Sequence, residues 1–171
     1  MYYVWTPDWE SPSVDEVSTP DGWDQLILFD GEKLDTTIPL PRFSISAEHA
    51  TDALVNHLAY LVFNSKLRRV IEELTHDPVQ YLPTSVICST TGKQIKDYAI
   101  CNPLVQIEGI DKGAEMGVNK IVLTKERVLE HSFFRIASFP YILIVREDIA
   151  RGVIESGCTG VAFEPVEDFR V

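Results

Sequence analysis

The chain has 171 residues with 45% hydrophobic side chains, enough for one folded domain with a buried core. Its apolar runs fall well short of a membrane span, and the first ten residues carry neither the basic region nor the apolar core of a secretion signal. A net charge of −11 disfavours nucleic acid as a partner. Three cysteines without metal-type spacing indicate reduced thiols, so we expect a cytoplasmic protein that binds neither nucleic acid nor membrane.

The acidic charge is concentrated near the N-terminus. Residues 1–52 carry eleven acidic side chains against two basic ones, a net charge of −9, whereas the rest of the chain carries a net charge of −2. Met1–Trp5 is predicted to form a short strand. Thr6–Asp24, with three prolines among Ser, Asp and Glu, is predicted to be a long surface excursion without a regular element. Trp9 and Trp23 are interpreted as anchors of this excursion to the core, with partner contact as the alternative.

The next segment has weaker patterns. Leu26–Phe29 is predicted to be a strand that ends at the turn signal Asp30-Gly31, and Pro39–Pro41 predicts an extended connection. Apolar spacing predicts a short helix over residues 47–58. A strand at Tyr60–Phe63 is favoured as the break between this helix and the next one.

Two strand–helix–strand units, related by a constant offset along the chain, are interpreted as its organising feature. The later unit spans Tyr141–Val166, with a helix that ends at Gly157, and the earlier one spans Tyr60–Thr84, with a helix capped by Asn64 or Ser65. The offset aligns the following pairs: Leu67 with Ile149, Tyr81 with Phe163, and Pro83 with Pro165. The pattern favours a duplicated unit, and chance resemblance between two common units remains the alternative.

Further strand patterns lie between the two units. They fall at Val86–Cys88, Ile95–Cys101, Leu104–Ile110, Lys120–Leu123 and Phe133–Ile136, with a short helix at Lys125–His131. Ser89–Lys93 is predicted to be the turn of a hairpin. The fold class predicted from all these elements is α+β: a single domain with a mostly antiparallel sheet and two to four helices.

Residue patterns for catalysis or cofactor binding are weak. The four histidines have no metal-ligand spacing, and Ser89–Lys93 lacks the glycine and the hydroxyl that a phosphate-binding loop needs at positions 87 and 94. Cys101 with His131, or Cys158 with His76, is the thiolate–base alternative, although buried structural cysteines are favoured. We therefore predict no catalytic residue, no metal and no cofactor, and a protein that is not an enzyme.

Several segments resemble a known bacterial family. They are Val62–Leu67, Val79–Pro83, Gly92-Lys93, Asp97–Asn102, Ser132–Arg135, Val145–Ile149 and Gly157–Val166, with looser agreement at Tyr2–Val4 and Phe29–Gly31. Their order and spacing resemble immunity family eleven of the polymorphic-toxin systems, over about two-thirds of the chain. Asn64 and Arg146 stand where that family usually opens its two helices with serine.

The resemblance implies a small cytoplasmic protein, encoded beside a secreted toxin, which binds that toxin and neutralises it by stoichiometric inhibition. It divides the single domain, residues 1–171, into an acidic N-terminal part, 1–59, and a family-like core, 60–171. The uneven charge makes the excursion the predicted surface for a basic toxin. The partner-binding candidates are Asp8, Trp9, Glu10, Asp15, Glu16, Asp21, Trp23 and Asp24. A small cytoplasmic enzyme and a regulatory scaffold module are the alternative functions.

Overall fold

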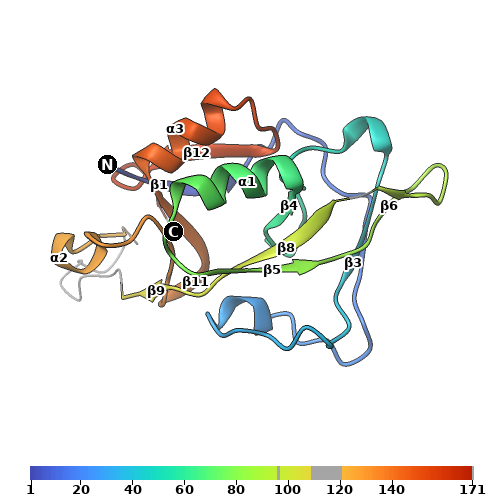
Figure 1. Ribbon diagram of the computed structural model, residues 1–171, viewed down its shortest axis with the longest axis horizontal. Coiled ribbons are helices and arrows are strands. Elements are labelled where there is room, and N and C mark those ends of the chain that lie inside the picture. The colour runs from blue at the N-terminus through green and yellow to red at the C-terminus, as the bar shows by residue number, and fades with distance from the viewer. Residues whose placement is uncertain (96, 109–120, 171) are drawn as a thin grey trace.

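Three small β-sheets and three α-helices make up the computed structural model, which describes residues 1–95, 97–108 and 121–170 (Figure 1). The five-stranded sheet has the order β12 (Val161–Pro165), β1 (Tyr2–Pro7), β11 (Phe139–Arg146), β10 (Phe133–Ile136) and β9 (Gln106–Ile107). The four-stranded sheet has the order β2 (Glu16–Ser18), β3 (Arg42–Ile45), β6 (Val86–Cys88) and β7 (Gln94–Ile95). The three-stranded sheet has the order β4 (Val62–Asn64), β8 (Tyr98–Pro103) and β5 (Val79–Pro83).

The helices are α1 (Ser65–Leu74), α2 (Lys125–Val128) and α3 (Glu147–Glu155), with 3₁₀ turns η1 (Ile27–Phe29) and η2 (Ala47–His49). Most strand pairings are antiparallel; the β3–β6 and β9–β10 pairings are parallel. The predicted class is therefore confirmed: the chain is a single α+β domain with mostly antiparallel strands. No helix in the described ranges is long and apolar enough to cross a membrane.

The two predicted strand–helix–strand units are present, and their elements keep the predicted offset. The shift that aligns Ser65, the first residue of α1, with Glu147, the first residue of α3, also superimposes β5 on β12 over their full lengths. In each unit the two strands are parallel to each other and are separated by one antiparallel strand, β8 in the first unit and β1 in the second. The register also repeats, since Cys101 lies opposite Tyr81 and Trp5 lies opposite Phe163.

The middle strand reaches its place by a different route in each unit. β8 follows β5 along the chain, whereas β1 precedes its whole unit and comes from the N-terminus. α1 and α3 pack side by side on the same side of the molecule (Figure 1). The two units therefore share one arrangement in space although the chain connects their strands in different orders.

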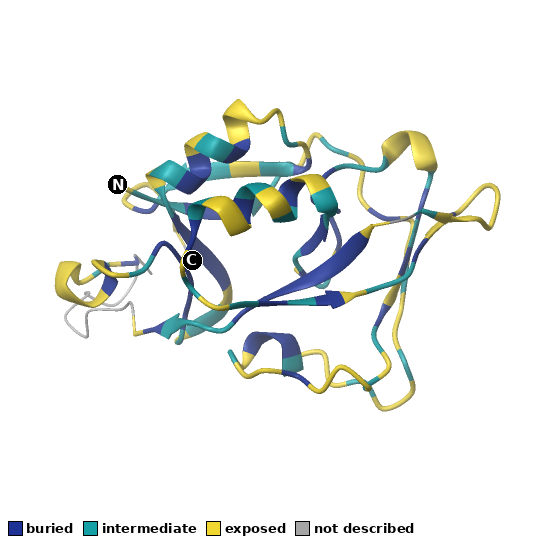
Figure 2. Ribbon diagram, viewed as in Figure 1, coloured by how far each residue is buried: buried dark blue, intermediate teal, exposed yellow. Residues whose placement is uncertain are grey.

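A common core lies beneath the two helices. The inward residues Leu67 and Ile71 of α1 and Ile149 and Val153 of α3 are each 0% exposed. They pack in one cluster with Trp5, whose ring lies against Phe63, Phe133 and Phe163. Each fully buried aliphatic side chain contributes about 1.5–3 kcal/mol. Figure 2 shows the result, with buried residues on the inner faces of both helices and exposed residues on their outer faces.

The two helices begin differently. Asn64 caps α1, because its Oδ1 accepts a hydrogen bond of 3.0 Å from the Leu67 N–H. Arg146 stands at the same place before α3 and makes no such cap. Its guanidinium instead donates two hydrogen bonds to Asp148, and the backbone of Met1 accepts from the Glu147 N–H. The predicted end of α3 is confirmed by Gly157, whose φ is +60°.

Two predictions for residues 26–58 were wrong. Leu26–Phe29 contains the 3₁₀ turn η1 in place of a strand, and the Asp24 carboxylate accepts the Leu26 N–H at its start. The predicted helix over residues 47–58 is reduced to η2. Beyond η2 the backbone is extended, because the Ala53 and Leu54 N–H groups bond to Thr159 and Val62. Pairing with distant segments outweighs the helical spacing here, and β4 confirms the predicted break before α1.

Other strand predictions also differ from the structure. β2 lies inside the excursion that was predicted to have no regular element, and it pairs with β3, which was not predicted. The strand predicted at 104–110 is reduced to β9, with residues 109 and 110 outside the described ranges. Residues 121–123 form no strand, and Lys120 lies outside those ranges. The predicted hairpin is confirmed as β6–β7, while β8 leaves it for the three-stranded sheet.

Candidate functional site

Two carboxylates with little exposed surface, of Asp52 and Asp77, each link one unit to a segment that pairs with the other unit. Asp77, just before β5, accepts hydrogen bonds from the Ser132 N–H at 2.6 Å and the Phe133 N–H at 2.8 Å. Asp52, just before the extended segment that pairs with β4, accepts them from the Thr159 N–H at 2.9 Å and hydroxyl at 3.1 Å. The offset that relates the two units aligns Asp77 with Thr159. A similar hydrogen-bonded contact, which we call a clasp, thus occurs twice. The aligned position supplies the carboxylate in one clasp (Asp77) and the hydroxyl in the other (Thr159).

The surroundings of these acids identify them as structural groups. Burial alone would raise their pKa values, but the hydrogen bonds that each carboxylate accepts outweigh burial, so the pKa of Asp52 and that of Asp77 are both lowered. His131 Nδ1 lies 2.7 Å from Asp77, and Lys66 Nζ lies 3.3 Å from Asp52. Both acids are fully engaged inside the scaffold.

The predicted thiolate–base alternatives gain no support. Burial raises the pKa of the Cys101 thiol, which is 1% exposed, and burial also raises that of Cys158. Within the described residues no hydrogen bond joins Cys101 to His131, whose ring contacts Asp77, or Cys158 to His76. No group of three or more potential metal-ligating side chains occurs in the same ranges.

The predicted partner-binding residues lie on the surface, and most are well exposed. Trp9, Glu10, Asp15, Glu16, Asp21 and Asp24 are exposed, and Asp8 and Trp23 are half-buried. None of these acids forms an ion pair within the part of the chain that the structure describes. Asp8 and Asp24 accept local hydrogen bonds, from Ser11 at 2.6 Å and from Leu26 at 2.9 Å. The other four carboxylates are free to meet a partner.

The excursion that carries these acids is fixed to the body of the protein at intervals. The Asp8 N–H donates to Gly160, the Val14 N–H to Val55 at 2.8 Å, and the Asp15 N–H to Ser44 at 2.7 Å. β2 then pairs with β3 at the edge of the four-stranded sheet. The free carboxylates are therefore held on an ordered backbone, which lowers the entropic cost of ordering the excursion when a partner binds.

The two tryptophans of the excursion have opposite surroundings. Trp23 packs against the core cluster that includes Tyr98 and Ile100 of β8, and its indole N–H donates a hydrogen bond of 3.0 Å to the Tyr60 hydroxyl. Trp9 is 79% exposed. The anchor interpretation is confirmed for Trp23 and wrong for Trp9, because a tight turn at Asp8–Ser11 lifts Trp9 away from the core.

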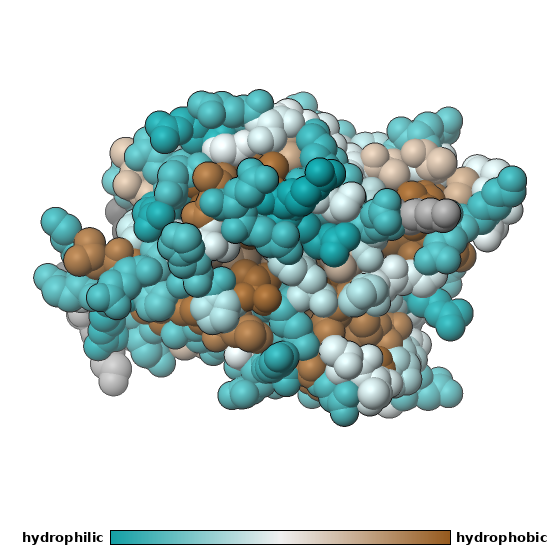
Figure 3. Space-filling model, in the orientation of Figure 1, coloured by the Kyte–Doolittle hydropathy of each residue, from teal (hydrophilic) through white to brown (hydrophobic). Residues whose placement is uncertain are grey.

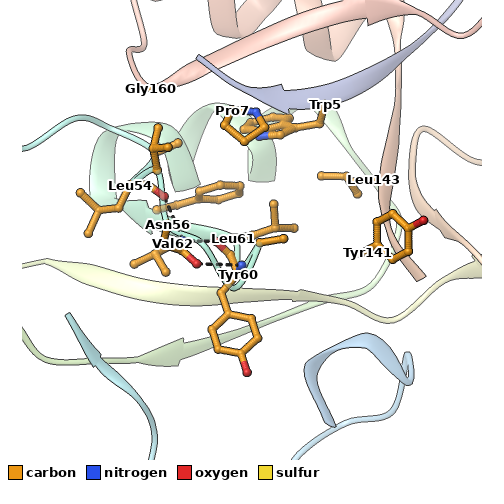
Figure 4. Close-up of a pocket in the computed structure, with 14 residues that line it drawn as sticks. Trp5, Pro7, Leu54, Asn56, Tyr60, Leu61, Val62, Tyr141, Leu143 and Gly160 are labelled. Atoms are coloured by element: carbon orange, nitrogen blue, oxygen red, sulfur yellow. Dashed lines mark hydrogen bonds between the residues drawn. The ribbon is translucent and has the colours of Figure 1, made fainter. Parts of the chain in front are cut away.

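A cavity of about 60 Å³ opens where the two units meet (Figure 4). Trp5 and Pro7 of β1 form one wall, the turn from Asn56 to Leu61 forms the opposite wall, and Leu143 and Tyr141 of β11 close one end. The Asn56 side chain fixes that turn by accepting the Tyr60 N–H at 3.1 Å and donating to its carbonyl at 2.7 Å. Among the described residues, no charged side chain lines the cavity. It can therefore hold an apolar group without burying an unpaired charge.

No protein-family model matches this chain, and no curated protein matches it.

Sequence patterns had missed two features of the structure. The cavity is assembled from separate segments of the chain, so no local pattern marks it. Arg135 sits in the apolar run Phe133–Ile136 and is 1% exposed, with its guanidinium 5.0 Å from the centre of the Phe29 ring and 2.6 Å from the Pro140 carbonyl. Burial lowers its pKa to about 10. A single arginine in a strand pattern gave no indication that it would point inward.

Proposed function

We propose that this protein binds and neutralises a basic toxin by stoichiometric protein–protein inhibition, as an immunity protein does. The observation that carries the proposal is the set of free, exposed carboxylates on the fixed excursion, at Glu10, Asp15, Glu16 and Asp21. Acidic side chains held in this way speed the association of a basic partner and set its orientation. The segments that resemble immunity family eleven favour the same function, although no family model matches the chain.

The lack of ion pairs at these acids, within the described ranges, favours a binding role over an internal one. A carboxylate that stabilises the fold is buried and accepts several hydrogen bonds, as Asp77 does. The excursion acids accept few or none from the residues that the structure describes. Figure 3 shows that hydrophilic residues also cover most of one face of the molecule, with hydrophobic residues in small separate clusters. On this face, polar and charged side chains therefore outnumber apolar ones as possible contacts for a partner.

Co-expression tests the proposal. We expect the product of a neighbouring gene to arrest growth when it is expressed alone, and the unmodified protein to restore growth at a one-to-one ratio. Reversal of three acids, Asp15→Lys, Glu16→Lys and Asp21→Lys, weakens the rescue. A matched reversal on α1 and just after α2, Glu72→Lys, Glu73→Lys and Glu130→Lys, leaves it intact, because these acids are also exposed but lie outside the excursion.

Two results would contradict this account. Full rescue by the Asp15, Glu16 and Asp21 triple variant would place the interface outside the excursion. Rescue at far less than one protein per toxin would indicate turnover, and so the enzyme alternative.

A further inference from the structure

We propose that the cavity between the two units receives an aliphatic side chain of the bound partner, one flanked in the partner's sequence by lysine or arginine. The inference rests on the proposed function and names the anchor point of that complex. It combines the apolar cavity, the acidic turn that directly follows the lining residue Pro7, and the exposed side chain of Tyr141 at one end of the cavity. Together these features form one anchor site.

The size and lining of the cavity select the occupant. Its volume of about 60 Å³ is several times the roughly 10–15 Å³ that one water molecule needs, and its walls include Trp5, Leu61 and Leu143. A single aliphatic side chain fits such a space and gains from leaving water. A charged group there would lose its hydration without gaining an ionic partner. An apolar anchor is therefore favoured over a buried lysine or arginine head.

The mouth of the cavity is reachable from solvent. Tyr141 is 51% exposed, and Ala59, on the opposite wall, is also exposed. Ala59 has a φ of +56°, a conformation that costs a residue with a Cβ about 1–2 kcal/mol. The Asn56 hydrogen bonds hold the turn in this shape before any partner arrives. Strain of this kind is concentrated at binding and catalytic sites, where it keeps the site preformed.

The charge at the rim determines what surrounds the anchor. Pro7 lines the cavity, and Asp8 follows it directly, with its N–H bonded to the carbonyl of Gly160, another lining residue. Trp9 and Glu10 come next in the same turn and are both exposed. No lysine or arginine of the described ranges lines the cavity. Basic residues on either side of the anchor thus meet the acids of this turn, and the exposed ring of Tyr141 is available for cation–π contact.

A cross-linking experiment with the intact protein and its co-expressed toxin tests this site. A photoreactive residue is placed by Tyr141→p-benzoyl-phenylalanine, with Leu129→p-benzoyl-phenylalanine as the control, since Leu129 is 66% exposed and lies beyond α2. The probe at position 141 is expected to cross-link to a toxin segment in which an aliphatic residue is flanked by Lys or Arg. The control probe joins no such segment.

Filling the cavity gives a second readout. Leu61→Trp fills the cavity and is expected to raise the dissociation constant of the toxin complex at least tenfold. If Leu61→Trp does not fold, Tyr141→Ala, which removes one end of the cavity, is expected to weaken binding in its place. Each variant is compared with the unmodified protein by its unfolding midpoint. Leu129→Trp serves as the control for an added indole and leaves the dissociation constant unchanged.

The outcomes separate the two proposals. Cross-linking to another kind of segment, or unchanged affinity in the folded cavity variants, overturns the anchor site; if acid reversal still weakens binding, the proposed function stands. Absence of any binding by the unmodified protein overturns both.

Discussion

The paired units and the acidic excursion use the same residue types in opposite ways. Around the units, the carboxylates of Asp52 and Asp77 have little exposed surface, each accepts several hydrogen bonds, and each links one unit to a segment that pairs with the other. In the excursion, Glu10, Asp15 and Glu16 are exposed, and their side chains accept no hydrogen bond within the described residues. The first pair of acids therefore stabilises the fold, whereas the exposed acids of the excursion are available for binding a partner. Changes in the units should unfold the protein, and changes in the excursion should cost only binding.

The contact between the units should be the most sensitive point. A Cβ added at Gly160, whose φ is +84°, would lie 1.9 Å from the Ala53 carbonyl oxygen. Gly160→Ala is expected to lower the free energy of unfolding by about 3 kcal/mol or more, since left-handed strain and a backbone clash add. Gly157→Ala is the matched control: its φ is +60° with open space around it, so it should cost about 1–2 kcal/mol. Urea denaturation of both variants measures the difference.

Removal of either clasp should be the next largest effect. Asp77→Ala leaves the buried N–H groups of Ser132 and Phe133 without an acceptor, and we expect a loss of about 3 kcal/mol. Asp52→Ala should cost about 2–3 kcal/mol, because Thr159 and Asn64 lose the same carboxylate. Asp15→Ala should stay within about 0.5 kcal/mol. Equal stability of all three variants would erase the contrast between the units and the excursion.

Acid should weaken the units through the same two groups. The pKa values of Asp52 and Asp77 are lowered in the folded protein, so their stabilising contribution is present above the ordinary aspartate pKa of about 3.9 and is lost as the pH falls from there through the lower pKa of the folded state. Thermal unfolding should therefore show stability falling below about pH 5. The double variant Asp52→Asn, Asp77→Asn should have a flatter profile. An unchanged profile would show that other acids cause the loss.

The tyrosine pair sharpens the comparison between the two units. Tyr98 opposite β4 and Tyr2 opposite β11 hold equivalent places. The Tyr98 hydroxyl donates to the Thr51 carbonyl at 2.6 Å, and the Tyr2 hydroxyl lies 2.6 Å from the Val128 carbonyl and 3.1 Å from that of His131. Tyr98→Phe and Tyr2→Phe should each cost about 1 kcal/mol. Burial raises the pKa of Tyr98 to about 12, so absorbance titration should show Tyr98 ionising late. A large difference between the two variants would argue against equivalent roles.

Sequence patterns predicted the units because their information is local. The helical stripe, the cap at Asn64 and the glycine at 157 lie within a few residues of the elements that they define. The same reasoning failed where distant pairing decides the backbone, as at Ala53, which bonds to Thr159. Leu26–Phe29 was predicted wrongly because a short apolar run does not distinguish a strand from one helical turn.

For the candidate site, the sequence predicted where the acidic charge lies but not the shape of the cavity. The uneven charge pointed to the excursion, and its acids are indeed on the surface. The different surroundings of Trp9 and Trp23 depend on a turn and on Tyr60, which lies far away in the chain. The cavity needs β1, β11 and the turn before β4 to come together, and only the folded structure brings them to one place.

The most direct test of the central claim, that the excursion recognises the partner while the units hold the fold, is a calorimetric titration of the toxin with the Asp15→Lys, Glu16→Lys, Asp21→Lys variant. We expect a dissociation constant raised about 10- to 100-fold at low salt, a smaller effect at high salt, and an unfolding midpoint close to that of the unmodified protein. Unchanged affinity at low salt, in a variant that is still folded, would contradict the central claim.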